Sequence, residues 1–246
     1  MKTLAKQLTE FISNYVKTAG AKGVVVGMSG GKDSFVAAKL CTLALGNENV
    51  FGLIMPDGEM KDIEIAKSEC EILKINYDVC NIEAVTSQVK NQTNQICKTE
   101  ALNEVSKINI APRVRMTLLY SVAANKNFLV VCTSNLSETM IGYSTKWGDG
   151  VGDFAPLADL TKTEVCELGL ALGLPKELVS KTPEDGLTGK SDEEKIGFSY
   201  EELDEFIREG KKSANFDKIS KMHTVSKHKR QLVTKFETGK TNHFKK

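Results

Sequence analysis

Residues 24–34 read Val24-Val25-Val26-Gly27-Met28-Ser29-Gly30-Gly31-Lys32-Asp33-Ser34, a β-branched run that ends in a Ser-Gly-Gly turn. Apolar residues then recur at helical spacing, which predicts a helix directly after the turn. Two adjacent glycines let the backbone turn sharply, so several N–H groups can point outward at the start of that helix. Ser29 and Ser34 add hydroxyl donors, and the helix dipole adds partial positive charge. The stretch therefore predicts a phosphate-binding turn between a strand and a helix.

The turn is not a Walker loop, because the chain contains no G-x-x-x-x-G-K-[ST] motif. It resembles the S-G-G-x-D-S loop of the N-type ATP pyrophosphatases, which hold ATP and cleave it to AMP and pyrophosphate. That resemblance implies adenylation chemistry rather than hydrolysis of the γ-phosphate. On the turn alone, an ordinary connection between a strand and a helix remains the alternative.

The composition is typical of a globular chain, with 41% hydrophobic residues, 26% charged residues and a net charge of +1. No apolar run approaches the roughly 20 residues of a membrane helix, and the N-terminus has no signal-peptide core. We therefore expect a cytoplasmic protein with no membrane partner. The six cysteines form no C-x-x-C pair, which disfavours zinc or iron–sulfur ligation and favours reduced thiols.

The rest of the chain alternates predicted helices and strands. An amphipathic helix is predicted over 1–16, and strands are predicted over 24–26, 50–55, 76–82 and 128–133. Between the strands, helices are predicted over 62–74, in part of 82–104, and from Pro112, because proline is favoured at a first helical position. Later helices are predicted over 162–172, 200–207 and 216–233, with loops over 142–159 and 182–192.

Strands separated by helices predict an α/β fold. We expect a doubly wound parallel sheet with helices on both faces, of the Rossmann-like or adenine nucleotide alpha hydrolase-like class. Such sheets bind ligands beyond the carboxyl ends of their strands. The glycine turn and Thr133-Ser134-Asn135 each follow a strand, so we expect both at one shared site. We expect a single domain over 1–236 and a flexible tail over 237–246.

Charge is distributed unevenly towards the C-terminus. Residues 184–209 are predominantly acidic, whereas residues 210–246 are strongly basic. A basic segment of this kind suits nucleic acid, the phosphates of a small substrate, or simple exposure to solvent. All three interpretations remain open on charge alone.

Five further segments carry chemistry-bearing residues. They are Pro112-Arg113-Val114-Arg115-Met116, Thr133 to Glu138, Gly142 to Gly150, Pro156 to Thr163, and Ser191 to Phe198. Together with the glycine turn, and in this order, they resemble NAD synthetase in its ammonia-dependent form. The resemblance runs from the first strand to His228-Lys229-Arg230.

This resemblance implies a ligase reaction in two steps. The nicotinate carboxylate of deamido-NAD attacks the α-phosphorus of ATP, giving an adenylated intermediate and pyrophosphate. Ammonia then attacks the activated carbonyl, giving NAD and AMP. The first step depends on positioning and on neutralising phosphate charge, with Mg²⁺ as the cofactor. Because the chain has no additional domain of the size that a glutamine amidohydrolase would require, we expect the nitrogen donor to be free ammonia or ammonia from a separate partner.

The same resemblance implies the site residues. The magnesium-ligating carboxylates would be Asp33 and Glu138, and the catalytic residues would be Asp33, Lys162 and Asp153. The implied ATP contacts are Gly27, Met28, Ser29, Gly30, Gly31, Lys32, Asp33, Ser34, Thr133, Lys162 and Glu184. The implied deamido-NAD contacts are Arg113, Lys146, Asp153, His228 and Lys229. Taken singly, each of these residues also suits an ordinary role as a helix-start or solvated surface residue.

Three positions depart from the family pattern. Lys32 stands where many NAD synthetases carry an uncharged residue, and we expect it to add a cation near the phosphates. Glu184 occupies a position where the family usually offers Ser or Thr to a phosphate, and Ile54 replaces an arginine found near adenine in some members. These departures affect details of ATP binding rather than the reaction class.

Two other function classes remain to be weighed. A tRNA-thiolating ATP pyrophosphatase is suggested by Lys32 and the basic C-terminus, but the chain lacks a C-x-x-C pair and an obvious RNA-binding domain. A non-catalytic nucleotide-binding module would tolerate loss of Asp33, Glu138 or Lys162, yet all three are present. The family resemblance implies a homodimer that binds small molecules and no nucleic acid, with residues 82–125 as the contact surface.

Overall fold

The computed structural model describes residues 1–59, 62–180, 191–231 and 233–236. Its strands are β1 (Gly23–Gly27), β2 (Val50–Ile54), β3 (Asn76–Val79) and β4 (Phe128–Val130). They form one parallel sheet in the order β3-β2-β1-β4, in which Val25 lies opposite both Phe51 and Val130. After β1 the chain adds β2 and β3 on one side of that strand, and β4 then pairs with the other side of β1. This arrangement confirms the predicted doubly wound α/β fold.

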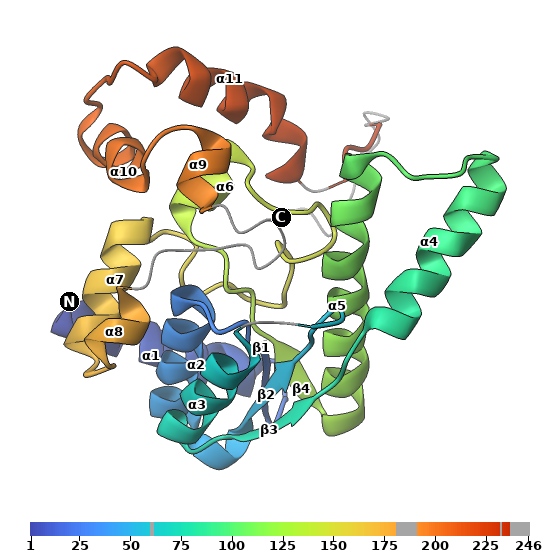
Figure 1. Cartoon of the computed structure of the whole chain (residues 1–246). Coiled ribbons are helices and arrows are strands. Elements are labelled where there is room, and N and C mark those ends of the chain that lie inside the picture. The colour runs from blue at the N-terminus through green and yellow to red at the C-terminus, as the bar shows by residue number, and fades with distance from the viewer. Residues whose placement is uncertain (60–61, 181–190, 232, 237–246) are drawn as a thin grey trace.

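The β1 side chains alternate between two hydrophobic cores, one on each face of the sheet. Val24 and Val26 belong to the larger core, whereas Val25 belongs to the other. The larger core is built with α1 (Lys2–Thr18), α2 (Lys32–Leu45), α3 (Ile63–Leu73), α7 (Lys162–Ala171) and α8 (Lys176–Val179). The opposite face is covered by α5 (Glu104–Lys126), and α4 (Glu83–Cys97) leans against the outer side of α5 (Figure 1). A short 3₁₀ turn, η1 (Asn47–Asn49), precedes β2.

A third cluster of helices lies beyond the carboxyl ends of the strands, at the top of Figure 1. It contains α6 (Leu136–Ile141), α9 (Asp192–Ile196), α10 (Tyr200–Glu209), α11 (Phe216–Val225) and the 3₁₀ turn η2 (Lys227–Lys229). Its core is made by Ile141, Ile196, Leu203 and Ile219 together with aromatic side chains. In the part of the chain that the structure describes, no helix is long and apolar enough to cross a membrane.

The prediction that Pro112 opens a helix is wrong, because Pro112 lies inside α5. That helix begins at Glu104, where the Asn103 side chain accepts a hydrogen bond from the Ser106 N–H at 2.8 Å. This cap starts the helix eight residues before Pro112, whose missing N–H leaves one backbone bond of the helix unmade. Pro112 lines the cavity described below, so the interruption lies on the inner surface of the helix.

The ends of other elements also differ from those predicted. The helix predicted over 216–233 ends at Val225, and the strand predicted over 128–133 ends at Val130, beyond which Val131 pairs with Phe154. The helices α6, α8 and α9, each of at most six residues, were not predicted, because such segments are too short to show helical periodicity. The predicted tail over 237–246 lies outside the described residues.

Candidate functional site

A cavity of about 440 Å³ opens at the carboxyl ends of the strands. It lies where the strand order reverses, between the segment after β1 and the segment after β4. Its wall includes the whole stretch Gly27 to Ser34, Thr133 and Ser134 after β4, and Arg115 and Leu119 from α5. The two segments that the sequence predicted to share a site therefore do so.

The glycine turn has a backbone conformation that glycine adopts readily and other residues do not. Gly30 has φ +76°, and a Cβ atom there would lie 2.9 Å from the backbone oxygen of Asp62. Ser34 is buried and donates its hydroxyl to the Gly31 carbonyl oxygen at 2.8 Å, while its oxygen lies 3.4 Å from the Ser29 N–H nitrogen. These bonds fix the turn at the N-terminus of α2, where unpaired N–H groups and the helix dipole favour an anion.

Asp33, Glu138 and Lys162 meet at the edge of this turn. The Lys162 ammonium nitrogen lies 2.8 Å from Asp33 Oδ2 and 2.5 Å from Glu138 Oε1. Asn135 links the two acids from behind, because its Nδ2 donates to Asp33 Oδ1 at 3.1 Å and its Oδ1 accepts the Glu138 N–H at 2.9 Å. All three charged residues line the cavity, so a ligand there meets one cation held between two carboxylates.

The backbone of Lys162 is held firmly at the start of α7. Thr161 caps that helix, and the Lys162 N–H donates to Ser137 Oγ at 2.9 Å. Ser137 in turn donates its hydroxyl to Asp204, whose second oxygen accepts the Thr163 N–H at 2.9 Å. Because Ser137 and Asp204 are both buried, this network fixes where the Lys162 side chain starts.

The burial of this cluster changes its proton affinities. Burial alone would lower the pKa of Lys162, but the carboxylates of Asp33 and Glu138 outweigh it, and the pKa lies well above its ordinary value. The raised pKa favours the charged ammonium form of Lys162. Burial raises the pKa of the Glu138 carboxyl, and the Lys162 ammonium opposes that rise.

Two tyrosines and an aspartate lie next to the Asp33–Lys162–Glu138 cluster. The Tyr200 ring centroid lies 5.1 Å from the Lys162 ammonium, and Tyr200 is 4% exposed. Tyr143 donates its hydroxyl to Asp192 Oδ1 at 3.0 Å. Burial raises the pKa of both tyrosine hydroxyls, which keeps them protonated. The Lys162 ammonium therefore has carboxylates on the cavity side and an aromatic face near it.

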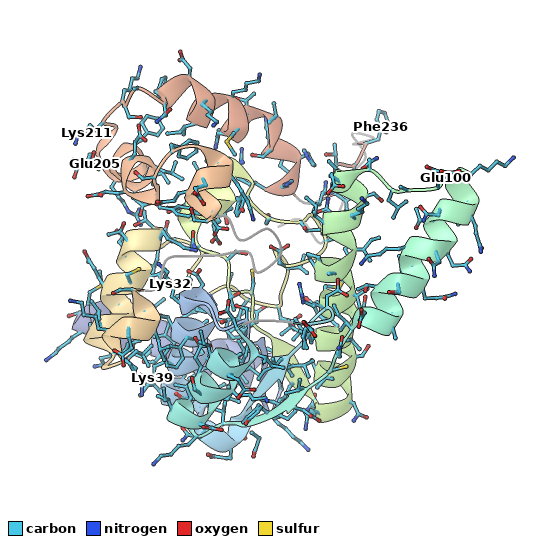
Figure 2. All side chains as sticks on the ribbon, viewed as in Figure 1. Lys32, Lys39, Glu100, Glu205, Lys211 and Phe236 are labelled. Carbon is cyan, nitrogen blue, oxygen red and sulfur yellow. The ribbon has the colours of Figure 1, made fainter. Side chains whose placement is uncertain are left out.

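Lys32 lines the cavity, but its ammonium does not lie against a carboxylate. Its nitrogen lies 3.5 Å from Cys166 Sγ on α7, and among the described residues it makes no ion pair within 4 Å. Figure 2 shows Lys32 at the upper end of α2, on the side that faces α7. The predicted ATP contact Glu184 lies outside the described residues.

The predicted deamido-NAD contacts do not line this cavity. Arg113 donates from Nε to the Lys146 carbonyl oxygen at 3.3 Å, so these two lie together. The Lys229 ammonium donates to the carbonyl oxygens of Gly142 and Ser144 and joins the same loop from α11's side, while His228 is exposed. Arg113, Lys146 and Lys229 thus share one region beside the cavity.

Asp153 is separate from that region. Its Oδ2 accepts the Val130 N–H at 2.7 Å, and its carbonyl oxygen accepts the Tyr15 hydroxyl at 2.7 Å. Asp153 also donates its own N–H to the Val130 carbonyl oxygen. The carboxylate is therefore part of the backbone pairing at the end of β4, where it holds the following loop in place.

Sequence reasoning assigned no role to Arg115 or Asn135. Arg115 lines the cavity from α5. Its Nε donates to the Met55 carbonyl oxygen at 2.9 Å, and this bond fixes the guanidinium at the cavity wall. Asn135 bridges the two acids. Both lie in segments that carried the family resemblance, but only their spatial neighbours reveal what they touch.

The oxygen atoms of Asp33 and Glu138 fit a magnesium ion that is shared with a phosphate ligand. Mg²⁺ is commonly held by one or two carboxylates, with substrate phosphates and water completing its shell. Across the described ranges, no group of three or more His, Cys, Asp or Glu residues is placed to hold a metal ion. The Lys162 ammonium marks the position between the two acids as one that favours a cation.

Comparison with known proteins gives one consistent family. A family model described as NAD synthase matches residues 4–246. An NH3-dependent NAD(+) synthetase of Thermococcus sibiricus is 44% identical over 202 residues, which cover 82% of this chain and 78% of that relative.

Solved structures agree with the sequence comparison. An NMN synthetase from Francisella tularensis matches with a TM-score of 0.88 and 34% identity, covering 95% of this chain and 97% of that chain. An NH3-dependent NAD synthetase from Campylobacter jejuni matches with a TM-score of 0.77 and 30% identity, covering 96% and 98%.

Proposed function

This chain belongs to the NAD synthase family, and on that premise we propose that its cavity adenylates deamido-NAD with ATP and then amidates it with ammonia. The products are NAD, AMP and pyrophosphate. One observation carries the proposal: a phosphate-binding turn lies directly beside the Asp33–Lys162–Glu138 cluster. The family comparisons favour this reaction over tRNA thiolation and over a non-catalytic nucleotide-binding module.

The ATP half of the reaction uses the glycine turn. The N–H groups at the start of α2 receive phosphate oxygens, and the Ser29 and Ser34 hydroxyls lie within the same turn. The Lys162 ammonium neutralises charge on the departing pyrophosphate, and Thr133 contacts ATP from the end of β4. These groups act by position and charge, which is the main contribution a protein makes to phosphoryl or nucleotidyl transfer.

Asp33 and Glu138 would hold Mg²⁺ in this scheme. When bound, the ion would neutralise phosphate charge and orient the α-phosphate for attack. The support for this assignment is the pair of carboxylates that converge on one cation beside the glycine turn.

The deamido-NAD half is assigned to Arg113, Lys146, His228 and Lys229. Arg113 and Lys229 donate hydrogen bonds to the loop next to the cavity, which carries Lys146. These side chains suit the phosphates of a dinucleotide. Asp153 contributes by fixing the end of β4 through its bond from the Val130 N–H, and so acts as a positioning residue.

We assign a homodimer on the basis of an apolar surface over α4 and α5. Five exposed side chains lie there: Val85, Val89, Ile96, Val105 and Ile108. Ile96 and Val105 are 78% and 68% exposed, which is unusual for β-branched residues on adjacent helices. The six cysteines are all free, which supports a reducing, cytoplasmic location.

A second candidate function uses the same chemistry on a smaller acyl substrate. The match to the NMN synthetase, at a TM-score of 0.88, supports nicotinate mononucleotide as an alternative to deamido-NAD. A kcat/KM at least tenfold higher for the mononucleotide would establish the second function.

The proposed function is tested by supplying ATP, Mg²⁺, ammonium and deamido-NAD to the purified chain. NAD and AMP should form in equal amounts, and pyrophosphate release should require deamido-NAD. Release of ADP, or AMP formation that does not depend on the acyl substrate, would refute it.

A further inference from the structure

The Lys162 ammonium occupies the place where the two acidic side chains converge. It lies 2.8 Å from Asp33 and 2.5 Å from Glu138, and its side chain is only 6% exposed. The two carboxylates are each 18% exposed, so water screens this cluster weakly. Lys162 is therefore the principal counter-charge of both acids.

A divalent cation that bridges the two acids would need Asp33 Oδ2, because Asp33 Oδ1 already accepts a hydrogen bond from Asn135 Nδ2 at 3.1 Å. Asp33 Oδ2 and Glu138 Oε1 are the atoms that the Lys162 ammonium contacts. An ammonium and a magnesium ion that share these carboxylates would repel each other strongly, because the cluster is mostly buried and its charges are weakly screened. The two cations therefore exclude one another at this position. Magnesium can bind the pair only if Lys162 moves its ammonium to another anion.

The structure leaves one direction for that movement. The Lys162 backbone is fixed by its N–H bond to Ser137 and by the capped start of α7, so only the side chain can turn. Tyr200 packs 5.1 Å from the ammonium and does not line the cavity, whereas Lys162 itself does. The free direction is therefore the cavity beside the glycine turn, where a triphosphate would offer new oxygen atoms.

We propose that Lys162 is a built-in competitor of the metal ion, which gives up Asp33 and Glu138 only when a triphosphate takes its ammonium. This inference rests on the proposed function for its ligands and concerns the order in which they bind. It follows that the divalent cation binds with ATP and has low affinity for the protein alone. Lys162 thereby changes from a counterion of the acids to a counterion of the phosphates in the same step.

The test is a titration with Mn²⁺, followed by electron paramagnetic resonance of the free ion, with no acyl substrate present. The wild-type protein alone should bind Mn²⁺ weakly. With α,β-methylene-ATP present, the protein should bind Mn²⁺ more tightly, with an affinity at least tenfold higher than that of the free analogue for Mn²⁺. Lys162→Met should bind Mn²⁺ at least tenfold more tightly than wild type without any nucleotide. Lys39→Met is the matched control, because it removes a lysine of α2 that does not line the cavity and makes no ion pair within 4 Å among the described residues, and it should leave nucleotide-free Mn²⁺ affinity unchanged.

Equal Mn²⁺ affinity in wild type and Lys162→Met without nucleotide would overturn the proposal. If Lys162→Met does not fold, as judged by its circular dichroism spectrum, the wild-type titration decides: equal affinity with and without the analogue refutes competition. Asp33→Asn should abolish tight Mn²⁺ binding in every background, and its failure to do so would also refute the site. None of these measurements requires turnover, so they test the binding order separately from the proposed amidation. Either proposal can be refuted while the other holds.

Discussion

Replacing Gly30 by alanine should separate the cost of a strained backbone from the loss of phosphate binding. Gly30 has φ +76°, a conformation that costs an L-residue roughly 1–2 kcal/mol. In addition, the new Cβ would lie 2.9 Å from the Asp62 backbone oxygen, so the turn itself must shift. Gly173 is the matched control, because it has φ +75° and a Cβ there would meet nothing within 4 Å.

Gly173→Ala should lose about 1–2 kcal/mol of stability, which lowers the Tm of a chain of this size by roughly 2–8 °C, and Gly30→Ala should lose more because of its additional contact with Asp62. Only Gly30→Ala should also raise the KM for ATP, by at least tenfold, because a displaced turn no longer presents its N–H groups to phosphate. The assay is the initial rate of NAD formation against ATP concentration, with thermal unfolding of each variant measured in parallel. A KM for ATP within twofold of wild type in Gly30→Ala would refute the role of this turn, as would an equal rise in Gly173→Ala.

Three further predictions follow from the cluster and the helix surface. Lys162→Met should reduce kcat for AMP release by about a hundredfold or more, since a preorganised charge at the transition state is lost; a loss under threefold would contradict this role. Tyr200→Phe should keep most activity, whereas Tyr200→Leu should reduce kcat several-fold, because the Tyr200 ring centroid lies 5.1 Å from the Lys162 ammonium and its face attracts the cation. Equal effects of the two variants on kcat would contradict this role of the ring. Val105→Asp should convert the proposed dimer to monomer in sedimentation velocity, because Val105 is 68% exposed on the apolar surface of α5, and an unchanged sedimentation coefficient would place the interface elsewhere.

The parts of the fold that depend on local sequence were predicted well. The β1 strand, the glycine turn and α2 follow one another within 23 residues, and each has a strong local signal. The first helix and α7 were likewise predicted, because their apolar residues recur at helical spacing. The start of α5 was predicted wrongly at Pro112, because proline's preference for a first helical position is a weaker signal than the Asn103 cap that starts this helix.

The contacts within the site could not be predicted from the sequence in the same way. Asp33 and Lys162 are 129 positions apart and Glu138 lies between them in the chain, so only the folded sheet brings their charges together. The backbone partner of Asp153 was likewise not predicted: its carboxylate accepts the N–H of Val130, and its contact with the substrate stays a prediction. A residue type and a motif indicate which chemistry is present, whereas the partner of each side chain depends on tertiary packing.

The central claim is that the carboxylate of deamido-NAD is activated by forming a bond to the α-phosphorus of ATP. Deamido-NAD labelled with ¹⁸O in both carboxylate oxygens tests this directly by mass spectrometry of the products. When ammonia displaces AMP from the adenylated carboxyl group, one labelled oxygen must leave with AMP and the other must remain in the amide of NAD. The account predicts one ¹⁸O atom in the phosphate of every AMP formed. AMP without label would contradict it.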